Sequence, residues 1–299
     1  MTRPVIIDTD PGIDDAIAIL YALAAPGLDV RAITTVAGNL GLAVTTRNAL
    51  RILALAGRDV PVIAGAAAPL ARPGVAEAAI HGDDGLGGVA FPDPAGPAVR
   101  SDASRFLAEV LLAHPPGHFD ILALAPLTNL ALLVRQAPQA AARIGRLIAM
   151  GGCIAEPGNV GPRSEFNLAQ DPEAAEVVLA AGLDLTLIPL DVTRKVRADA
   201  GYLDRLAALA TPPALAARDL IAAYFDRTSD AARPTSRPLH DPCVPVLALR
   251  PDLFGLREMR LRVDCTDDPG ALVAGPHRVQ VAMAVEAATV LDLLAAALA

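Results

Sequence analysis

Four aspartates lie within eight residues near the start of the chain: Asp8, Asp10, Asp14 and Asp15. Carboxylates this close together repel one another, and each raises the pKa of its neighbours unless a cation neutralises them. A group of oxygen ligands suits a hard ion such as Ca²⁺ or Mg²⁺. Helix capping would account for Asp14 or Asp15 alone. Because capping leaves Asp8 and Asp10 unexplained, the cluster favours a metal site.

Two predicted elements position these acids. The apolar run at 5–7 predicts a buried parallel strand, which puts Asp10 at its carboxyl end. A proline and a glycine then turn the chain, and residues 16–25 have the composition and the apolar spacing of a helix. Asp14 and Asp15 therefore lie near the N-terminus of that helix, so that three of the four acids can converge on one point.

Short apolar runs alternate with helical segments along most of the chain, which is the pattern of a mainly parallel α/β sheet. Strands are predicted at 30–36, 62–64, 120–125, 147–150 and 185–189, and helices at 45–56, 103–113, 130–136 and 172–181. Near the end, 256–264 and 278–284 predict two further strands that can pair, followed by a helix at 285–298. We expect residues 1–299 to form one domain, an open sheet flanked by helices with a Rossmann-like core and a small C-terminal β addition.

Two stretches interrupt this alternation. Residues 65–100 hold many glycines and prolines and show little periodicity, so we expect a functional lid or binding loop there. Residues 198–236 look helical, with breaks at 211–213 and again near 233–234.

Composition narrows the function classes. Of the 299 residues, 53% are hydrophobic, which suffices for a sizeable core. No apolar stretch approaches the roughly 20 residues of a membrane span, and no targeting segment is recognisable, so we expect a cytoplasmic protein with no membrane partner. Three scattered cysteines without a CxxC pair predict reduced thiols and no zinc site. With 25 basic against 33 acidic residues, we expect a small-molecule partner and no nucleic acid.

Polar side chains follow several predicted strands at their carboxyl ends, where an open α/β sheet binds its ligands. They are Asn39 after the second strand, Asn129 after the fourth, Asn159, Glu165 and Asn167 after the fifth, and His240 with Asp241 late in the chain. Each of these alone could be a turn or a helix cap. Their shared position at one edge of the sheet indicates a binding site.

Six ordered blocks of this sequence resemble landmarks of the inosine-uridine-preferring nucleoside hydrolases, the nucleoside N-ribohydrolases. The blocks are the aspartate-rich opening at 8–15, then 33–39, 126–129, 150–152, 165–167 with 171–175, and 240–243. The resemblance implies that fold and an enzyme that hydrolyses the N-glycosidic bond of ribonucleosides. It also implies a role in purine or pyrimidine salvage and assembly as a homodimer or homotetramer.

By the same resemblance, the cofactor is Ca²⁺. Its ligands would be the carboxylates of Asp10, Asp15 and Asp241 and the main-chain carbonyl of Leu124, together with a water and two ribose hydroxyls. The chemistry agrees, because cleavage passes through an oxocarbenium-like state that needs an activated water and a fixed sugar. Ca²⁺ can hold a cis-diol and a water together and stabilise hydroxide, so that Asp10 can take the proton of the water.

The resemblance also implies the residues that bind the sugar. Asp14, Asn39 and Asn167 would hydrogen-bond the ribose 2′ and 3′ hydroxyls, and Asn159 with Glu165 the 5′ hydroxyl. Asparagine side chains both donate and accept, so they can bind vicinal hydroxyls in a fixed orientation. A 2′-deoxy sugar would leave such buried groups unpaired, and we expect the site to discriminate against it.

Departure of the base needs a proton donor, and His240 is the first candidate. It directly precedes Asp241, and an imidazole can protonate a leaving base near neutral pH. The alternatives are a structural histidine or one that only contacts the base. His81, on the expected lid, is a second residue that could contact the base.

The aromatic residues bear on which nucleobase the enzyme prefers. The chain has no Trp, so it cannot hold a purine between indoles as the purine-specific branch of the family does. This favours a pyrimidine-preferring or broad enzyme. The aromatic candidates near the site are Phe166, Tyr224 and Phe225, and Arg227 and Arg233 are candidates in a segment that matches the family poorly.

Two other function classes stay open. A strand followed by Asp8-x-Asp10 is similar to the opening of haloacid-dehalogenase-like phosphatases, although the two later aspartates have no role there and a phosphate calls for a well-placed Lys or Arg. A non-catalytic nucleoside- or calcium-binding protein on the same scaffold is the other. The complete set of candidate ligands gives no sign of lost activity.

Overall fold

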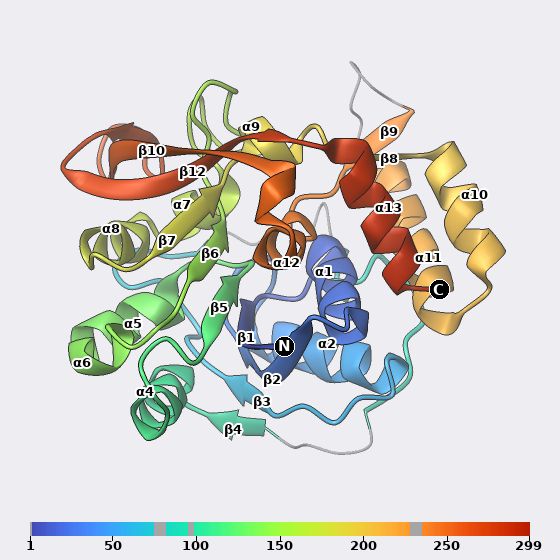
Figure 1. The fold of residues 1–299 in the computed structure, drawn as a ribbon, viewed down its shortest axis with the longest axis horizontal. Helices are drawn as coiled ribbons and strands as arrows, with labels where there is room; N and C mark the ends of the chain where they lie inside the picture. Colours follow the sequence, from blue (N-terminus) through green and yellow to red (C-terminus); the bar gives the residue numbers. More distant parts are fainter. Residues whose placement is uncertain (1, 75–81, 95–98, 228–234) are drawn as a thin grey trace.

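A computed structural model describes residues 2–74, 82–94, 99–227 and 235–299 of the chain, and in these ranges ten strands form one sheet (Figure 1). From edge to edge the strands are β11 (Leu272–Ala274), β10 (Phe254–Val263), β12 (His277–Val285), β7 (Leu185–Ile188), β6 (Leu147–Met150), β5 (Asp120–Ala123), β1 (Arg3–Thr9), β2 (Leu28–Thr35), β3 (Val62–Ala64) and β4 (Val99–Ser101). A separate antiparallel pair consists of β8 (Arg197–Asp199) and β9 (Ser236–Pro238).

The first strand lies in the interior of the sheet. β1 pairs in parallel with β2 on one side and with β5 on the other. From β2 to β4 the chain extends the sheet on the first side, and it then returns to extend it from β5 to β7 on the second. β1 therefore lies where the strand order reverses, and in open α/β sheets this is where the diverging loops leave room for a ligand.

The two strands expected near the C-terminus do pair. β12 continues the sheet in parallel from β7, and β10 and β11 follow it as antiparallel strands. The expected mainly parallel open sheet with a small C-terminal β addition is confirmed.

Helices cover both faces of the sheet (Figure 1). Along β1, Val5 and Ile7 belong to one hydrophobic core and Ile6 to the other, as the alternation of side chains in a strand requires. The first core includes α1 (Ile13–Ala24), α2 (Leu42–Leu55), α9 (Leu190–Thr193), α10 (Ala200–Leu209), α11 (Pro212–Arg227), α12 (Cys243–Leu249) and α13 (Ala287–Ala297), and the second α4 (Ala103–Ala113), α5 (Thr128–Gln136), α6 (Pro138–Ala141), α7 (Phe166–Gln170) and α8 (Pro172–Ala180).

Each predicted strand and helix of the regular alternation agrees with an observed one to within three residues at either end. β3, β6 and α4 have the predicted bounds, whereas α1 and α2 begin at Ile13 and Leu42, ahead of the predicted starts. The first turn of α1 contains Asp14 and Asp15, so its start lacks an apolar stripe. The prediction of a loop over 65–100 was wrong at its end, where β4 begins, and β8 and β9 were not predicted. Strands of three residues show no periodicity.

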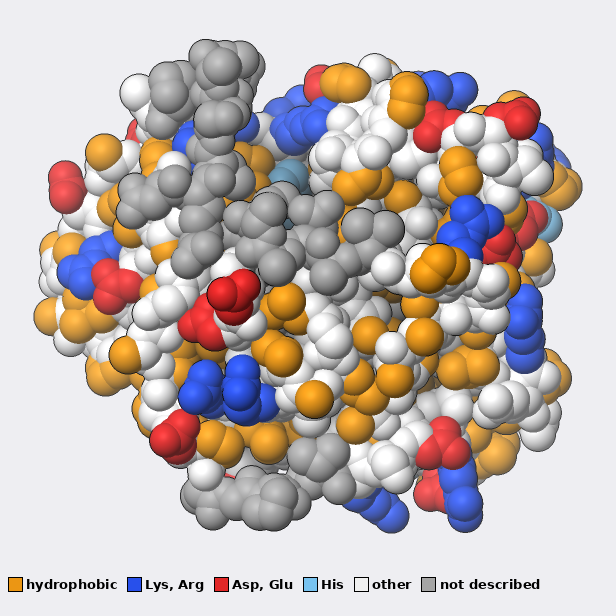
Figure 2. Space-filling view, turned by 180° about the vertical axis from the view of Figure 1, so that it is seen from behind, with side chains coloured by type: hydrophobic (Ala, Val, Ile, Leu, Met, Phe, Trp, Pro, Cys, Tyr) orange, Lys and Arg blue, Asp and Glu red, His pale blue; other side chains and the backbone are white. Residues whose placement is uncertain are grey.

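One face of the molecule carries charges of both signs. On the face in Figure 2, Lys and Arg side chains alternate with acidic and hydrophobic ones. None of the described helices is both long and apolar enough to cross a membrane. Cys153 and Cys243 are buried and Cys265 half-buried, all three as free thiols, as expected.

Candidate active site

A pocket of about 140 Å³ opens where the strands in the middle of the sheet end. Its lining residues are Asp14, Asn39, Leu124, Met150, Asn159, Val160, Glu165, Phe166, Asn167, Tyr224, His240 and Asp241. All but Met150, Val160 and Tyr224 belong to the site predicted from the sequence, and Tyr224 was among the aromatic candidates. The polar residues that follow separate strands are therefore brought together, as their shared position at the edge of the sheet had indicated.

Asp10 directly follows β1 and is only 1% exposed. Its Oδ2 accepts a hydrogen bond from the backbone N–H of Asn39 at 2.6 Å. A Cβ on Gly38 would lie 2.0 Å from this oxygen, so only glycine lets the backbone pass so close. The other oxygen, Oδ1, is buried, and no described residue donates to it. A buried carboxylate oxygen without a donor is costly. Asp8 Oδ2 shares this property, but Asp10 also bonds to Asn39, which lines the pocket, and this makes its Oδ1 the candidate position for a ligand.

Asp15 lies in the first turn of α1. Its carboxylate accepts from the hydroxyl of Thr9 at 2.5 Å and from the backbone N–H of Gly12 at 3.0 Å. The bond from Gly12 closes the start of the helix, so helix capping is a correct description of Asp15. The side-chain amide of Asn39 also donates to Asp15 Oδ2 at 3.2 Å and ties this carboxylate to the surroundings of Asp10.

The start of α1 also contacts the late segment of the chain. Asp14 Oδ2 accepts from the backbone N–H of His240 at 2.9 Å. The carboxyl group of Asp241 belongs to the same cluster, and the negative charges of Asp15, Asp14 and Asp10 all disfavour its ionised form. Buried carboxylates that repel one another need protons or a cation to neutralise them.

Burial and mutual repulsion shift the pKa values of this group. Burial raises the pKa of Asp10 and of Asp241 well above the usual range of a carboxyl, and the charge of Asp15 raises both further. Burial raises the pKa of Asp14 to about 7 and also raises that of Asp15, where hydrogen bonds limit the rise. The four buried acids therefore carry less negative charge than free carboxylates unless a cation stabilises them.

The donor set fits a hard cation by its chemistry. The Leu124 carbonyl, the expected main-chain ligand, lines the pocket and accepts from the side-chain amide of Asn167 at 2.9 Å. Within the described ranges, no three Asp, Glu, His or Cys side chains form a ready-made metal-binding group. The donors are all oxygen, however, and Asp10 Oδ1 lacks a donor. A cation bound among these oxygens would neutralise carboxylates that otherwise repel one another.

Glu165 and Asn159 form the opposite wall of the pocket. The Glu165 carboxylate caps α7 by accepting from the backbone N–H groups of Asn167 at 2.9 Å and Leu168 at 3.2 Å. Burial raises the pKa of Glu165 to about 7. Asn159 Oδ1 accepts from the backbone N–H of Phe166 at 2.9 Å, which fixes Asn159 beside the aromatic ring.

Sequence reasoning missed the role of α9. Thr193 Oγ1 lies 2.7 Å from His240 Nδ1. Asp191 accepts from the backbone N–H groups of Ile154 at 2.8 Å and Ala155 at 2.7 Å, and Arg194 donates to the carbonyl of Pro157. α9 thus fixes both His240 and the chain segment that leads to Asn159. The signal was present in the sequence, because these polar residues directly follow the strand β7.

Asp8 and Asn129 are not among the residues that line the pocket. Asp8 is buried below it, where Oδ1 accepts from Thr34 Oγ1 at 2.5 Å and from Asn129 Nδ2 at 2.8 Å. Burial raises its pKa to about 6. Asn129 therefore holds β1 and is not a pocket residue. His81 and Arg233 lie outside the described residues.

The structure is that of an α/β protein with a polar pocket beside a buried carboxylate cluster. The family model of the inosine-uridine preferring nucleoside hydrolases matches residues 5–292, so the chain belongs to this family. It is therefore a glycosidase that acts on N-glycosyl compounds, and membership implies a metal-dependent enzyme.

The relatives differ in the substrates that their names give. A pyrimidine-specific ribonucleoside hydrolase, RihA of Citrobacter koseri, is 41% identical over 85% of this chain and 81% of its own length. The non-specific ribonucleoside hydrolase RihC of Salmonella paratyphi B is 39% identical over 87% and 83% of the two chains. A solved structure, the purine-preferring ribonucleoside hydrolase of Gardnerella vaginalis, has a TM-score of 0.93 and 28% identity over 99% of this chain and 98% of its own.

Proposed function

We propose that this chain hydrolyses the N-glycosidic bond of ribonucleosides with Ca²⁺ as its cofactor. The observation that carries the proposal is the buried Asp10 Oδ1, which has no donor among the described residues and lies in the same repelling group as Asp15 and Asp241. When bound, Ca²⁺ would hold the ribose diol and a water and would lower the pKa of that water. Asp15, Asp241 and the Leu124 carbonyl would complete the protein ligands.

In this mechanism Asp10 is the general base. Its Oδ2 is fixed by the N–H of Asn39, which leaves Oδ1 to take a proton from the attacking water. The acidic surroundings favour the positive charge that develops on the sugar as the bond to the base breaks.

The sugar would be held by the polar residues of the pocket. Asp14, Asn39 and Asn167 would bind the 2′ and 3′ hydroxyls, and Asn159 with Glu165 the 5′ hydroxyl. All five line the pocket, which supports this assignment. Asn39 and Asn167 are already oriented by hydrogen bonds to Asp15 and to the Leu124 carbonyl, so little freedom is lost when a sugar binds.

The base would leave on the side of His240. We infer that His240 donates a hydrogen bond or a proton to it, since its ring lies at the pocket and is oriented by Thr193. Phe166, Val160 and Tyr224 supply apolar surface in the same pocket. In the absence of Trp, these residues favour a pyrimidine-preferring or broad enzyme. Contact of His81 with the base, a cytoplasmic location, a salvage role and a homodimer or homotetramer stay predictions.

The competing phosphatase function requires a nucleophile that Asp8 does not supply. Asp8 is 0% exposed, and its bonded oxygen accepts from Thr34 and Asn129, so no phosphate can reach it in this arrangement.

The deciding experiment measures free base and free ribose from uridine, cytidine, inosine and adenosine. The purified protein is assayed as isolated, in excess chelator, and after Ca²⁺ or Mg²⁺ is added back. We expect chelator to abolish ribose release and Ca²⁺ to restore it. Release of phosphate from uridine 5′-monophosphate without release of base would favour the phosphatase. Binding of uridine without turnover under every condition would favour the non-catalytic alternative.

A further inference from the structure

The loop between β6 and α7, residues 151–165, carries two residues of the pocket wall near its tip. These are Asn159 and Val160, and the backbone N–H groups of both donate to the carbonyl of Ser164, at 3.1 and 3.3 Å. The loop contains no helix or extended strand that would fix it by itself. Asp191 and Arg194 hold the first half of the loop, and the bonds to Ser164 fix its tip from the other side.

Ser164 is held from outside the loop by Asp268. Asp268 Oδ1 accepts from the hydroxyl of Ser164, and Oδ2 accepts from the backbone N–H of Arg163 at 3.0 Å. A Cβ on Gly161 would lie 2.9 Å from Asp268 Oδ1, so the glycine lets the loop close around the carboxylate. Hydrogen bonds to a charged acceptor are stronger than neutral ones, which makes Asp268 an effective anchor.

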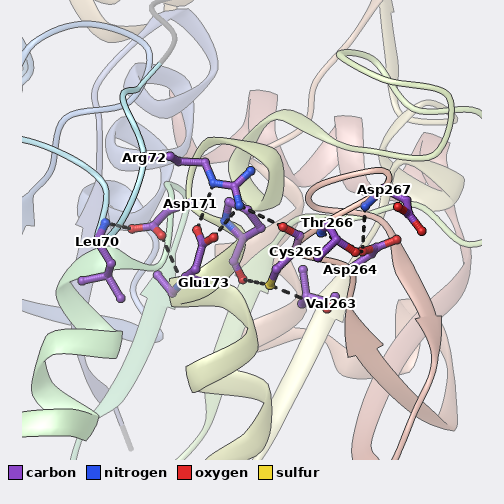
Figure 3. A network of polar contacts seen from close by, with 11 residues as sticks. Leu70, Arg72, Asp171, Glu173, Val263, Asp264, Cys265, Thr266 and Asp267 are labelled. Carbon is purple, nitrogen blue, oxygen red and sulfur yellow. Dashed lines mark hydrogen bonds and ion pairs between the residues drawn. The ribbon is translucent and has the colours of Figure 1, made fainter.

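Asp268 belongs to the turn between β10 and β11, residues 264–270, and this turn is itself fixed (Figure 3). Asp264 Oδ1 accepts from the backbone N–H of Thr266 at 2.9 Å. Arg72 donates to the carbonyl of Cys265 at 3.0 Å and forms an ion pair with Glu173 of α8. The turn is therefore also tied to α8 and to the segment after β3, which lie outside the loop that it contacts.

The same turn packs on the helix that carries Asn167. Gly270 has a φ of +94°, and a Cβ there would lie 2.5 Å from the Cα of Ala169 in α7. Only glycine allows this backbone conformation and this close approach. One turn of the C-terminal β addition thus contacts both segments that form the wall of the pocket.

We propose that the 264–270 turn positions the wall of the substrate pocket and that Asp268 is the residue through which it acts. Asp268 does not line the pocket, so it is a positioning residue and not a catalytic one. Through Ser164 it sets where Asn159 meets the sugar. The inference rests on the proposed function, in which Asn159 binds the ribose 5′ hydroxyl.

Two variants and a matched control test this inference. Asp268→Ala removes both acceptors, and Asp268→Asn keeps one acceptor for the Ser164 hydroxyl while replacing the other with a donor. The control is Asp267→Ala, an exposed neighbour in the same turn. Amide hydrogen exchange at Arg163 and Asn159 reports directly on the loop. We expect faster exchange in Asp268→Ala, a smaller increase in Asp268→Asn and no change in the control, with the melting temperature confirming that each variant is folded.

Steady-state kinetics on uridine and 5′-deoxyuridine test the link to the substrate. Asp268→Ala removes the hydrogen bond that holds Ser164 and, through it, Asn159. We therefore expect KM for uridine to rise about tenfold, the size of effect typical of losing a hydrogen bond to a charged group, with kcat nearly unchanged. KM for 5′-deoxyuridine should stay at the wild-type value. Unchanged exchange at Arg163 and Asn159, or an equal rise in KM for both substrates, would overturn the inference.

The outcomes separate this inference from the proposed function. Wild-type protein that releases no ribose from uridine refutes the proposed function, and exchange in the Asp268 variants then still decides whether the turn holds the loop. Wild-type protein that hydrolyses uridine and 5′-deoxyuridine equally refutes the assignment of Asn159 to the 5′ hydroxyl and, with it, the link from Asp268 to the substrate.

Discussion

The hydroxyl of Thr193 lies 2.7 Å from Nδ1 of His240, across 47 positions of the sequence. Thr193 is fully buried at the end of α9, so this contact fixes the orientation of the imidazole ring. Because Nδ1 is engaged there, Nε2 is the nitrogen that can serve a departing base. The orientation of His240 is therefore set by a helix that sequence reasoning did not connect with it.

Replacing Thr193 by Val should slow the hydrolysis of uridine about five- to tenfold, since one such hydrogen bond contributes about 1 kcal/mol. Thr193→Ser keeps the hydroxyl and should restore most of the rate. The measurement is kcat on uridine and on p-nitrophenyl riboside, whose leaving group needs no proton. Equal slowing on both substrates would mean that Thr193 supports the pocket in general.

Replacing His240 by Ala should slow natural nucleosides by about 10²- to 10⁴-fold, the usual range for general acid catalysis. p-Nitrophenyl riboside should be affected far less, and the comparison of kcat on the two substrates is the measurement. If both substrates slow to the same extent, the acid lies elsewhere, and His81 is the next residue to test.

Without metal, the variant Asp10→Asn should be more stable than the wild-type protein, and it should be inactive. In the absence of metal, Asp10 is repelled by Asp15 and holds a buried oxygen without a donor, and the neutral amide removes that repulsion. We expect its melting temperature in chelator to rise by about 1.5 °C per kcal/mol gained. Calorimetric titration should detect weakened Ca²⁺ binding, and turnover should fall by at least about 10³-fold. A variant with wild-type turnover contradicts the role of Asp10.

Acid should stabilise the metal-free protein. Burial raises the pKa of Asp8 to about 6 and those of Asp14 and Glu165 to about 7, whereas an unfolded carboxyl titrates near about 4. A group that binds its proton more tightly in the folded chain stabilises the fold at low pH, and this contribution is lost as the pH rises from about 4 through the folded pKa. The melting temperature in chelator should therefore be higher at pH 5 than at pH 8.

Added Ca²⁺ should reverse this trend, because it binds the deprotonated carboxylates and raises the melting temperature more at pH 8 than at pH 5. A melting temperature in chelator that increases from pH 5 to pH 8 would show that these groups do not dominate the stability of the metal-free protein.

Removing the 2′ hydroxyl of the substrate should nearly abolish turnover. The proposed site holds the ribose diol with Asp14, Asn39 and Asn167, and a deoxy sugar leaves these buried groups unpaired. Sites built around a hydroxyl discriminate by up to about 10⁴-fold. The ratio of kcat/KM for uridine and deoxyuridine measures this effect, and a ratio near one would show that the pocket does not bind the sugar in this way.

The part of the site around Asp10 could be predicted because the strand, the turn and the helix that hold it are contiguous in the sequence. Asn39 and Asn167 could be predicted for a related reason, since each follows an element that the apolar pattern reveals. The position of Asp241 required the resemblance to a family, because no local pattern indicates that residue 240 bonds to residue 14.

The supporting residues could not be predicted from periodicity. α9 has four residues, which is about one turn and too short for a 3.6-residue repeat. Asp268 lies in a turn whose composition, with three aspartates, a proline and a glycine, is that of any exposed turn. Contacts between distant segments decide the function of both, and a single sequence does not show such contacts.

The hydrogen bond between Asp14 and the backbone of His240 joins two segments that are synthesised at different times. At about 5–20 residues per second, a ribosome adds the last carboxylate of the cluster roughly 10 to 50 seconds after the first. Throughout that interval the nascent chain carries Asp10, Asp14 and Asp15 without Asp241, and so without the full set of protein ligands proposed for the cation. If the proposed ligand set holds the cation, tight binding would require the last fifth of the chain to have docked, and metal binding would then mark a completely folded chain.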